Sequence, residues 1–266
     1  MKQFLSALTL VILFAGCKKG YTDPTSGLHI VPPKIKQIKT DHYSYDFIYD
    51  ASSSKIDKII VNYLYDVDHV KKSRLDATYT FEYDKENKVI TANADRVVNQ
   101  VLLVNMDEEY KFSYADGRIH SVETDPAYSI ALNTLSIYDY DLSGNLIKAQ
   151  NEDTSNEYRY INNVLTRSIH TAINGSISDE YEYKFSQYKN PTNSLDKAIA
   201  ILINKNLYGP SSDPAISLQN NYLSSRDEVQ YIVLEAKKNY PTKVLIKSQL
   251  NSQKFTSNLA FEYFDF

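Results

Sequence analysis

Aromatic and polar residues alternate along several short stretches of the chain. The pattern is clearest in four segments: Tyr79–Tyr83, Tyr110–Tyr114, Tyr181–Phe185 and Leu259–Tyr263. A period of two places the aromatic side chains on one face of a strand and the polar side chains on the other. An amphipathic helix would scatter these rings around its axis. The pattern therefore predicts half-buried antiparallel strands, and looser copies lie at Tyr43–Tyr49, Tyr138–Tyr140 and Tyr158–Tyr160.

Each aromatic segment is followed by a turn and then by an aliphatic segment. The turns carry the Gly, Asn and Asp residues that tight hairpins need for positive φ: Asp116-Gly117, Ser143-Gly144-Asn145, Asn162-Asn163 and the longer Asp84–Lys88. We expect an all-β domain whose successive hairpins form an antiparallel up-and-down meander. The spacing of equivalent tyrosines shortens along the chain, from Tyr49 through Tyr83, Tyr114 and Tyr140 to Tyr160. The repeat is therefore degenerate and does not predict a rigid solenoid.

One segment, residues 194–207, has the pattern of a short helix. Ser194 is a suitable N-cap, Asp196 suits the first turn, and Gly209 and Pro210 end the segment. Its apolar stripe consists of Leu195, Ala198, Ile199, Leu202 and Ile203. We expect this helix to cover a sheet edge or to plug one end of a barrel. A membrane-surface role is disfavoured because Lys197 and Lys205 are its only cations.

The amino terminus predicts export. Lys2 precedes the mostly apolar run Phe4–Phe14, which is too short to span a bilayer and has the character of a signal peptide. Phe14-Ala15-Gly16-Cys17 resembles the lipobox of bacterial lipoproteins, which implies cleavage after residue 16 and acylation of Cys17. Residues 17–34 are rich in Gly and Pro and predict a flexible tether, so we place a single tyrosine-rich domain at 35–266.

Composition narrows the possible partners. Cys17 is the only cysteine among the 266 residues, so no disulfide framework exists and the core alone must hold the fold. Loss of the signal peptide leaves 28 basic and 33 acidic side chains, a net charge of −5. A mildly acidic chain argues against nucleic acid as a partner. We expect contact with the membrane through the acyl anchor only.

The hairpins carry a resemblance to known families. The segment Tyr138-Asp139-Tyr140-Asp141-Leu142-Ser143-Gly144-Asn145-Leu146-Ile147 resembles the tyrosine-aspartate hairpins of the Rhs and teneurin shells. The chain is more similar to a family of uncharacterised Bacteroidetes lipoproteins, a domain of unknown function with a porin-like fold, whose members share a Tyr…Asn-Pro segment found here at Tyr181–Pro191. This resemblance covers roughly residues 36–266. It implies an antiparallel sheet that is curved or closed into a barrel, and it implies no activity.

Alternation alone does not distinguish a membrane-spanning barrel from a soluble barrel with an aromatic core. The lipobox and the charges in segments such as Arg118–Glu123 favour the soluble domain on a tether. Since Lys18 and Lys19 follow the cysteine, without an aspartate, we expect anchorage in the outer membrane, with the domain facing the periplasm or the exterior.

The sequence contains no motif for catalysis or cofactor binding. It lacks a glycine-rich phosphate loop, a Gly-x-Ser-x-Gly elbow and a His-Glu-x-x-His motif. The five histidines, His29, His42, His69, His120 and His170, are too irregularly spaced to predict a shared metal. Asp66-Val67-Asp68-His69 and Asp107-Glu108-Glu109 are the densest acidic groups, and both are more typical of solvated turns. We expect no catalytic residue, no metal site and no cofactor.

The tyrosines are the one abundant feature with a functional interpretation. The chain has 23 Tyr and no Trp, and most of the rings occupy the inward period of their strands, where core packing explains them. Tyr63 and Tyr65, at the end of a strand, and Tyr208 and Tyr222, in loop-like sequence, are the candidates for ligand contact.

Three functional classes remain open. The favoured one is a non-enzymatic envelope lipoprotein that binds a glycan or a protein partner through a concave face or cavity of the sheet. The second is a structural or assembly component of the envelope, which would present a free sheet edge or a self-complementary patch. The third is a glycoside hydrolase, which would need two carboxylates converging in a cleft.

Overall fold

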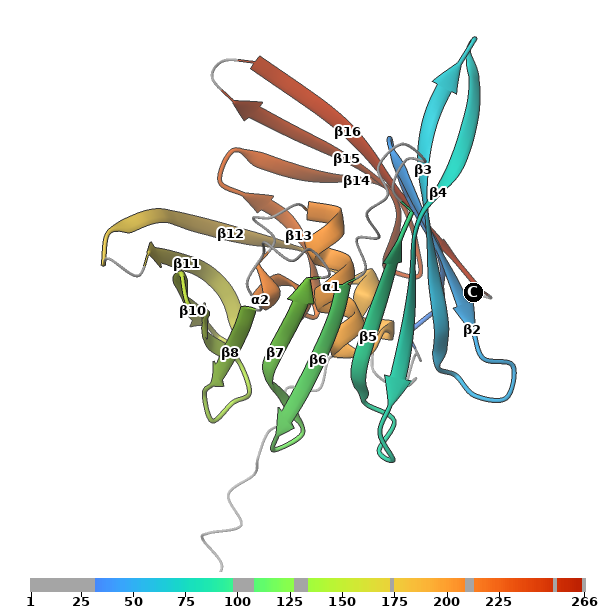
Figure 1. Cartoon of the computed structure of the whole chain (residues 1–266). Coiled ribbons are helices and arrows are strands. Elements are labelled where there is room, and N and C mark those ends of the chain that lie inside the picture. The colour runs from blue at the N-terminus through green and yellow to red at the C-terminus, as the bar shows by residue number, and fades with distance from the viewer. Residues whose placement is uncertain are drawn as a thin grey trace, which may run out of the picture. The chain divides into compact units, whose positions relative to one another are not determined.

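The computed structural model describes residues 32–97, 108–126, 134–172, 175–208, 213–250 and 253–264. They belong to one compact unit, Pro32–Phe266. Sixteen described strands form a closed antiparallel barrel, with three described helical segments between β12 and β13 (Figure 1). The predicted signal peptide, Cys17 and all but the last three residues of the predicted tether lie outside the described residues.

The elements follow one another along the chain without long crossovers. The strands are β1 (Ile35–Thr40), β2 (Tyr43–Tyr49), β3 (Ile56–Val67), β4 (Val70–Tyr83), β5 (Val89–Arg96), β6 (Glu108–Ala115), β7 (Arg118–Pro126), β8 (Thr134–Tyr140), β9 (Leu146–Gln150), β10 (Thr154–Ile161), β11 (Val164–Ala172), β12 (Ile177–Lys189), β13 (Asn221–Arg226), β14 (Val229–Lys237), β15 (Tyr240–Leu250) and β16 (Gln253–Tyr263). The helical segments are the 3₁₀ turn η1 (Pro191–Ser194), α1 (Lys197–Tyr208) and α2 (Pro214–Ser217).

The topology is the predicted meander, and it is closed. Every strand pairs with its neighbours in sequence, and β1 pairs with β16 through a register that places Ile38 opposite Phe261. Closure removes both sheet edges, which would otherwise expose unpaired backbone groups. The fold-class prediction is confirmed, and of its two forms, curved or closed, the closed barrel is the one observed.

The two ends of the barrel differ. The connections at residues 50–55, 84–88, 116–117, 141–145, 162–163 and 238–239 lie at one end, which we call the turn end; the two ends of the described domain meet there too, because Phe264 N–H bonds to the Lys34 carbonyl at 2.9 Å. The opposite end is the loop end. The turns have the predicted chemistry, since Asp116, Gly117, Asn162 and Asn163 all have positive φ.

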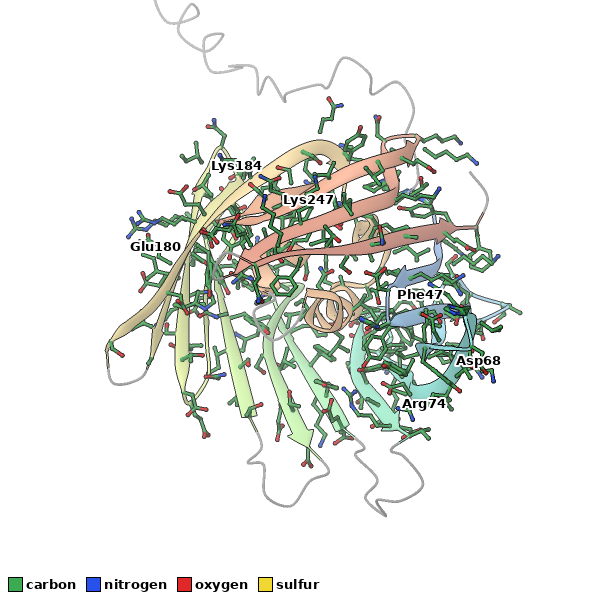
Figure 2. The ribbon with its side chains drawn as sticks, turned by 90° about the horizontal axis from the view of Figure 1, so that it is seen from above. Phe47, Asp68, Arg74, Glu180, Lys184 and Lys247 are labelled. Atoms are coloured by element: carbon green, nitrogen blue, oxygen red, sulfur yellow. The ribbon has the colours of Figure 1, made fainter. Side chains whose placement is uncertain are left out.

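The apolar face of the sheet points into the barrel. Phe47, Ile59 and Phe112 are examples of strand residues that belong to one buried cluster with residues of α1. The helix fills the interior, and Figure 2 shows it surrounded by the ring of strands. Its buried apolar positions, Ala198, Ile199, Ala200, Leu202 and Ile203, include the four apolar positions of the predicted stripe that fall within α1. The predicted helix is therefore confirmed, and it plugs the barrel from within.

The outer face carries charged side chains along its strands. Asp139, Lys148 and Glu157 stand opposite one another on β8, β9 and β10, which forms a row of alternating charge. Lys111 pairs with Glu109 at 2.6 Å, and Lys243 pairs with Glu235 at 2.7 Å. A barrel that spans a membrane turns an apolar band outward, and a Lys or Arg at its midplane costs about 2–4 kcal/mol. Charged rows of this kind would be costly in a band that faces lipid.

None of the described helices is long and apolar enough to cross a bilayer.

A repeated hydrogen bond explains the spacing of the tyrosines. At the turn end, a tyrosine hydroxyl reaches back to a carbonyl at or near the start of a preceding strand: Tyr49 to Ile35 (3.0 Å), Tyr83 to Ile56 (2.7 Å), Tyr114 to Val89 (2.7 Å), Tyr160 to Leu146 (2.8 Å) and Tyr263 to Pro241 (2.7 Å). In several of these places a basic side chain covers the ring, as Lys55 does for Tyr83 at 4.9 Å from the centroid. Four of the five tyrosines used to define the repeat make this bond. The fifth, Tyr140, is covered by Arg118.

We expect Tyr83→Phe to lower the free energy of unfolding by about 1 kcal/mol, because it removes one such bond and leaves the Ile56 carbonyl without its donor. Urea denaturation of the chain after Cys17 measures the change. Tyr65→Phe, on the exposed part of the β3–β4 hairpin, is the matched control and should change stability by less than about 0.5 kcal/mol. Equal losses in both variants would contradict a structural role for the turn-end hydroxyl.

Residues 190–220, between β12 and β13, form what we call the helical insert, and buried polar groups hold it in place. Asn190 donates to the Gln219 carbonyl at 3.1 Å and accepts from Thr192 N–H at 3.1 Å, so it closes the insert at its base and caps η1. Asn204 donates to Ser217 at 2.7 Å, which joins α1 to α2. The two hydrogen bonds of Asn190 explain why asparagine stands before Pro191 at the start of the insert.

Candidate functional site

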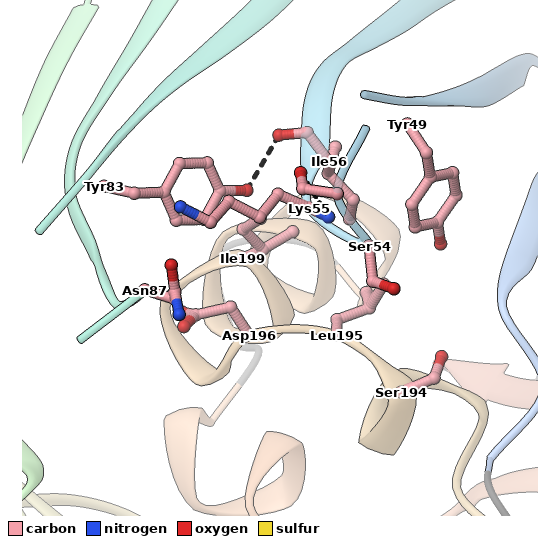
Figure 3. Close-up of a pocket in the computed structure, with 11 residues that line it drawn as sticks. Tyr49, Ser54, Lys55, Ile56, Tyr83, Asn87, Ser194, Leu195, Asp196 and Ile199 are labelled. Atoms are coloured by element: carbon pink, nitrogen blue, oxygen red, sulfur yellow. Dashed lines mark hydrogen bonds between the residues drawn. The ribbon is translucent and has the colours of Figure 1, made fainter. Parts of the chain in front are cut away.

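A cavity lies at the turn end, where the insert meets two hairpins. It has a volume of about 430 Å³, and we call it cavity A. Its walls come from the ends of β2 and β4, from the turns that follow them and from residues 194–199 (Figure 3). The lining residues are Tyr49, Ser53, Ser54, Lys55, Ile56, Tyr83, Asn87, Ser194, Leu195, Asp196 and Ile199.

Two tyrosine rings give cavity A fixed aromatic walls. The hydroxyls of Tyr49 and Tyr83 are held by the Ile35 and Ile56 carbonyls, and the second of these bonds is drawn in Figure 3. Burial raises the pKa of Tyr49 to about 12 and raises that of Tyr83 as well. Both rings are therefore neutral and anchored at physiological pH, and each carries a lysine ammonium over its face, Lys34 over Tyr49 at 5.0 Å and Lys55 over Tyr83 at 4.9 Å.

Asp196 is the carboxylate of cavity A. Its side chain accepts from Ala198 N–H at 2.8 Å and its carbonyl accepts from Ala200 N–H at 2.8 Å, so Asp196 is the N-cap of α1. The prediction that Ser194 caps the helix is wrong, because Pro191–Ser194 forms a separate 3₁₀ turn and α1 begins at Lys197. Burial raises the pKa of Asp196, although backbone N–H groups oppose the change.

A second cavity lies on the other side of Asp196. This cavity B has a volume of about 330 Å³ and is lined by Lys88, Tyr114, Gly117, Arg118, Ile119, Tyr140, Gly144, Asp196, Lys197 and Leu218. It repeats the aromatic and basic lining of cavity A around the next two hairpins.

Two of the predicted ligand-contact tyrosines lie together at the loop end. The rings of Tyr63 and Tyr65 stack at 6.2 Å between centroids, Tyr43 meets Tyr63 edge-on at 5.5 Å, and Arg74 covers Tyr63 at 5.2 Å. Both predicted residues keep part of their surface exposed, beside a small hollow of about 140 Å³ lined by Tyr43, Tyr45, Val61, Asp76, Ala77, Tyr79 and Arg96. Whether this group contacts a ligand stays a prediction.

The other two predicted tyrosines do not lie in loops. Tyr222 is in β13, only 2% of its surface is exposed, and its ring packs edge-on against Phe261. Tyr208 is the last residue of α1. The loop interpretation is wrong for both, because α1 extends to Tyr208 and β13 begins at Asn221. A substitution at Tyr222 would test core packing.

A buried polar cluster inside the barrel was missed by sequence reasoning. The side chain of Asp213 is fully buried; it accepts from the Tyr183 hydroxyl at 2.8 Å, and Ser168 lies 2.8 Å from that same hydroxyl. Asp213 also caps α2 through Ala215 N–H at 3.1 Å. Burial, followed by the charge of Asp213, raises the pKa of Tyr183. The signal that could have located this residue is Asp213-Pro214, an N-cap followed by proline at the first helical position.

The acidic groups noted in the sequence have structural roles. Asp68 and His69 form the β3–β4 turn with positive φ. Glu108 pairs with Arg96 at 3.3 Å and accepts from the Tyr110 hydroxyl, whereas Asp107 lies outside the described residues. His42, His69 and His120 are exposed, and His29 is not described. Within the described part of the chain, no three His, Cys, Asp or Glu residues converge as a metal site would require.

The fold is similar to that of solved porin-like proteins. One, from Bacteroides uniformis, matches with a TM-score of 0.54 and 11% identity over 88% of this chain and 98% of its own. Another, from Bacteroides vulgatus, matches with a TM-score of 0.38 and 12% identity over 88% of this chain and 100% of its own. No family model and no curated protein matches the chain. The comparison supports the porin-like fold implied by the resemblance, while the lipoprotein family and the Rhs-like repeats stay predictions.

Proposed function

We propose that this chain is a non-enzymatic lipoprotein of the bacterial cell envelope that binds a small neutral glycan in cavity A. The observation that carries the proposal is the lining of the cavity. Two anchored tyrosine rings face a set of hydroxyl, amide and ammonium groups from Ser53, Ser54, Asn87 and Lys55. Saccharides present apolar C–H faces and rims of hydroxyls, so a fixed aromatic wall beside polar groups suits them, and about 430 Å³ is an ordinary size for a ligand site.

The hydrolase alternative requires two carboxylates in one cleft. Among the described residues, Asp196 is the only carboxylate that lines cavity A or cavity B, and Asp76 is the only one in the hollow at the loop end. The described cavities therefore favour binding over hydrolysis. The alternative of a structural or assembly component is not supported by the sheet, because the closed barrel has no free strand edge at which copies could pair.

The envelope assignment rests on the lipobox and the outer wall. Acylation at Cys17 would tether the chain to the outer membrane through a linker of residues 17–34, facing the periplasm or the exterior. The charged rows on the outer face suit a barrel that stands in water beside the membrane. The fold likeness to a porin-like Bacteroides protein agrees with this setting.

A cavity-blocking substitution tests the site. Ser54 is exposed and lines cavity A, so Ser54→Trp should fill the cavity without disturbing the core. We expect the saccharide that binds most tightly on a glycan array to bind this variant at least about tenfold more weakly in solution. Because the chain has no tryptophan, indole fluorescence of the variant reports directly on the cavity.

Ala51→Trp is the matched control, since Ala51 is exposed in the same turn and does not line cavity A. It should change the affinity by less than about twofold, and so should the double variant Tyr63→Ala/Tyr65→Ala at the loop end. An array without any saccharide hit, or a loss confined to the Tyr63/Tyr65 variant, would overturn the placement in cavity A.

A further inference from the structure

Cavity B collects positive charge without carboxylates to match it. Lys88, Arg118 and Lys197 line it, against the single carboxylate of Asp196. None of the three cations forms an ion pair with a carboxylate among the described residues. Cations that lack a carboxylate partner repel one another unless an anion or water screens them.

The nearby turn carboxylates are already engaged. Asp84 accepts from Lys88 N–H at 2.8 Å, and Asp141 accepts from both the backbone N–H and the side-chain amide of Asn145 at 2.9 Å. These bonds orient the two carboxylates toward the turn backbone. All three cations line cavity B, and the Lys88 ammonium lies over the Tyr114 ring at 5.3 Å from the centroid.

Arg118 is held in place by its surroundings. Its guanidinium lies over the Tyr140 ring at 5.6 Å and donates to the Asp141 carbonyl at 3.4 Å. A Cβ at Gly144 would come within 3.0 Å of the guanidinium, so glycine is the residue that leaves room for it. A stacked guanidinium presents a planar fork of N–H donors, the geometry that binds carboxylate and phosphate.

Lys197 adds a recessed cation. It stands at the first position of α1, inside the ring of strands, and it still keeps more than a third of its surface exposed. Reduced hydration lowers its pKa, and the charge of Asp196 opposes this. A lysine that is surrounded by the barrel wall and still open to solvent is available to an incoming anion.

We infer that cavity B is a second binding site, distinct from cavity A, for an oxyanion carried on a compact polar ligand such as a sugar acid or a sugar phosphate. Arg118 would contact the oxyanion through its fork of donors, and Lys88 and Lys197 would neutralise its charge. The rings of Tyr114 and Tyr140 would pack against the body of the ligand.

Calorimetric titration of the chain after Cys17 tests this with four probes: glucuronate, glucose 6-phosphate, inorganic phosphate and glucose. We expect at least one of the anions to bind at least about tenfold more tightly than glucose, and its affinity to fall as ionic strength rises from about 0.01 to 0.15 M. Tighter binding of a sugar anion than of inorganic phosphate would identify a sugar-bearing ligand, and equal binding would identify free phosphate. No preference for any anion over glucose would overturn the inference.

Lys197→Gln and Arg118→Gln should each weaken anion binding by about tenfold. Lys85→Gln is the matched control, because Lys85 is exposed in the same turn as Lys88, carries the same charge and does not line cavity B. An equal loss in Lys85→Gln would show a general charge effect and contradict the site. Ser54→Trp should leave anion binding within about twofold, which separates failure of cavity A from failure of cavity B.

Discussion

Raising the pH from about 9 to about 12 is expected to unfold the barrel. Burial raises the pKa of Tyr49, Tyr140 and Tyr231 to about 12, and it raises those of many other interior tyrosines. In the unfolded chain the same phenols ionise near pH 10. The native state therefore keeps protons that the unfolded state releases, so the stabilisation is complete below pH 10 and is lost as the pH rises toward the folded values.

The size of the effect follows from the number of such groups. Tyr231, which is only 8% exposed, alone accounts for roughly 3 kcal/mol once the pH exceeds its folded pKa. Domains are stable by about 5–15 kcal/mol, so a few such tyrosines suffice. Absorbance of tyrosinate near 295 nm and far-ultraviolet circular dichroism should change together in one transition above pH 10.

The control is the same titration in guanidinium chloride, where the phenols should ionise near pH 10 without cooperativity. Tyrosines that ionise near pH 10 while the circular dichroism of the barrel persists would contradict the buried environment assigned to them.

Asp213→Ala is expected to lower the free energy of unfolding by about 2.5–4 kcal/mol. The variant removes a buried, charge-assisted hydrogen bond from Tyr183, worth about 1.5–3 kcal/mol, and the cap of α2, worth about 1 kcal/mol. It also leaves the Tyr183 hydroxyl without its carboxylate acceptor, although Ser168 stays near. Urea denaturation, fitted with one m value for the parent chain and the variant, measures the change.

Asp213→Asn should lower the free energy of unfolding by less than Asp213→Ala does, because the amide oxygen can still accept a hydrogen bond from Ala215 N–H. Asp50→Ala is the matched control, since that carboxylate accepts backbone N–H groups of Ser52 and Ser53 in an exposed turn. It should cost no more than about 1 kcal/mol. A loss below about 1 kcal/mol for Asp213→Ala would show that the cluster does not hold the insert in the barrel.

Local patterns in the sequence predicted the repeated parts of the fold. Alternation placed strands at Tyr79–Tyr83 and Tyr110–Tyr114, and Asn162-Asn163 and Asp116-Gly117 form the tight turns that their conformational preferences favour. The stripe from Ala198 to Ile203 identified the helix. Each of these signals is contained within a few residues, which is why one sequence was enough.

The sites depend on contacts between distant segments, which no local pattern contains. Cavity A joins Tyr49, Tyr83 and Asp196, and the cluster around Asp213 joins β11 and β12 to the insert. Tyr222 was assigned to loop-like sequence, whereas it lies in β13 with its ring against Phe261. Of the predicted contact residues, Tyr63 and Tyr65 lie together, with their rings stacked.

The most direct test of the account is a crystal structure of the chain after Cys17 grown with its tightest-binding neutral saccharide. We predict electron density for the sugar in cavity A, with one face of its ring against Tyr49 or Tyr83 and its hydroxyls within hydrogen-bonding distance of Ser54, Asn87 or Asp196. A sugar bound instead beside Tyr63 and Tyr65, or a cavity A closed by its own side chains, would contradict the account.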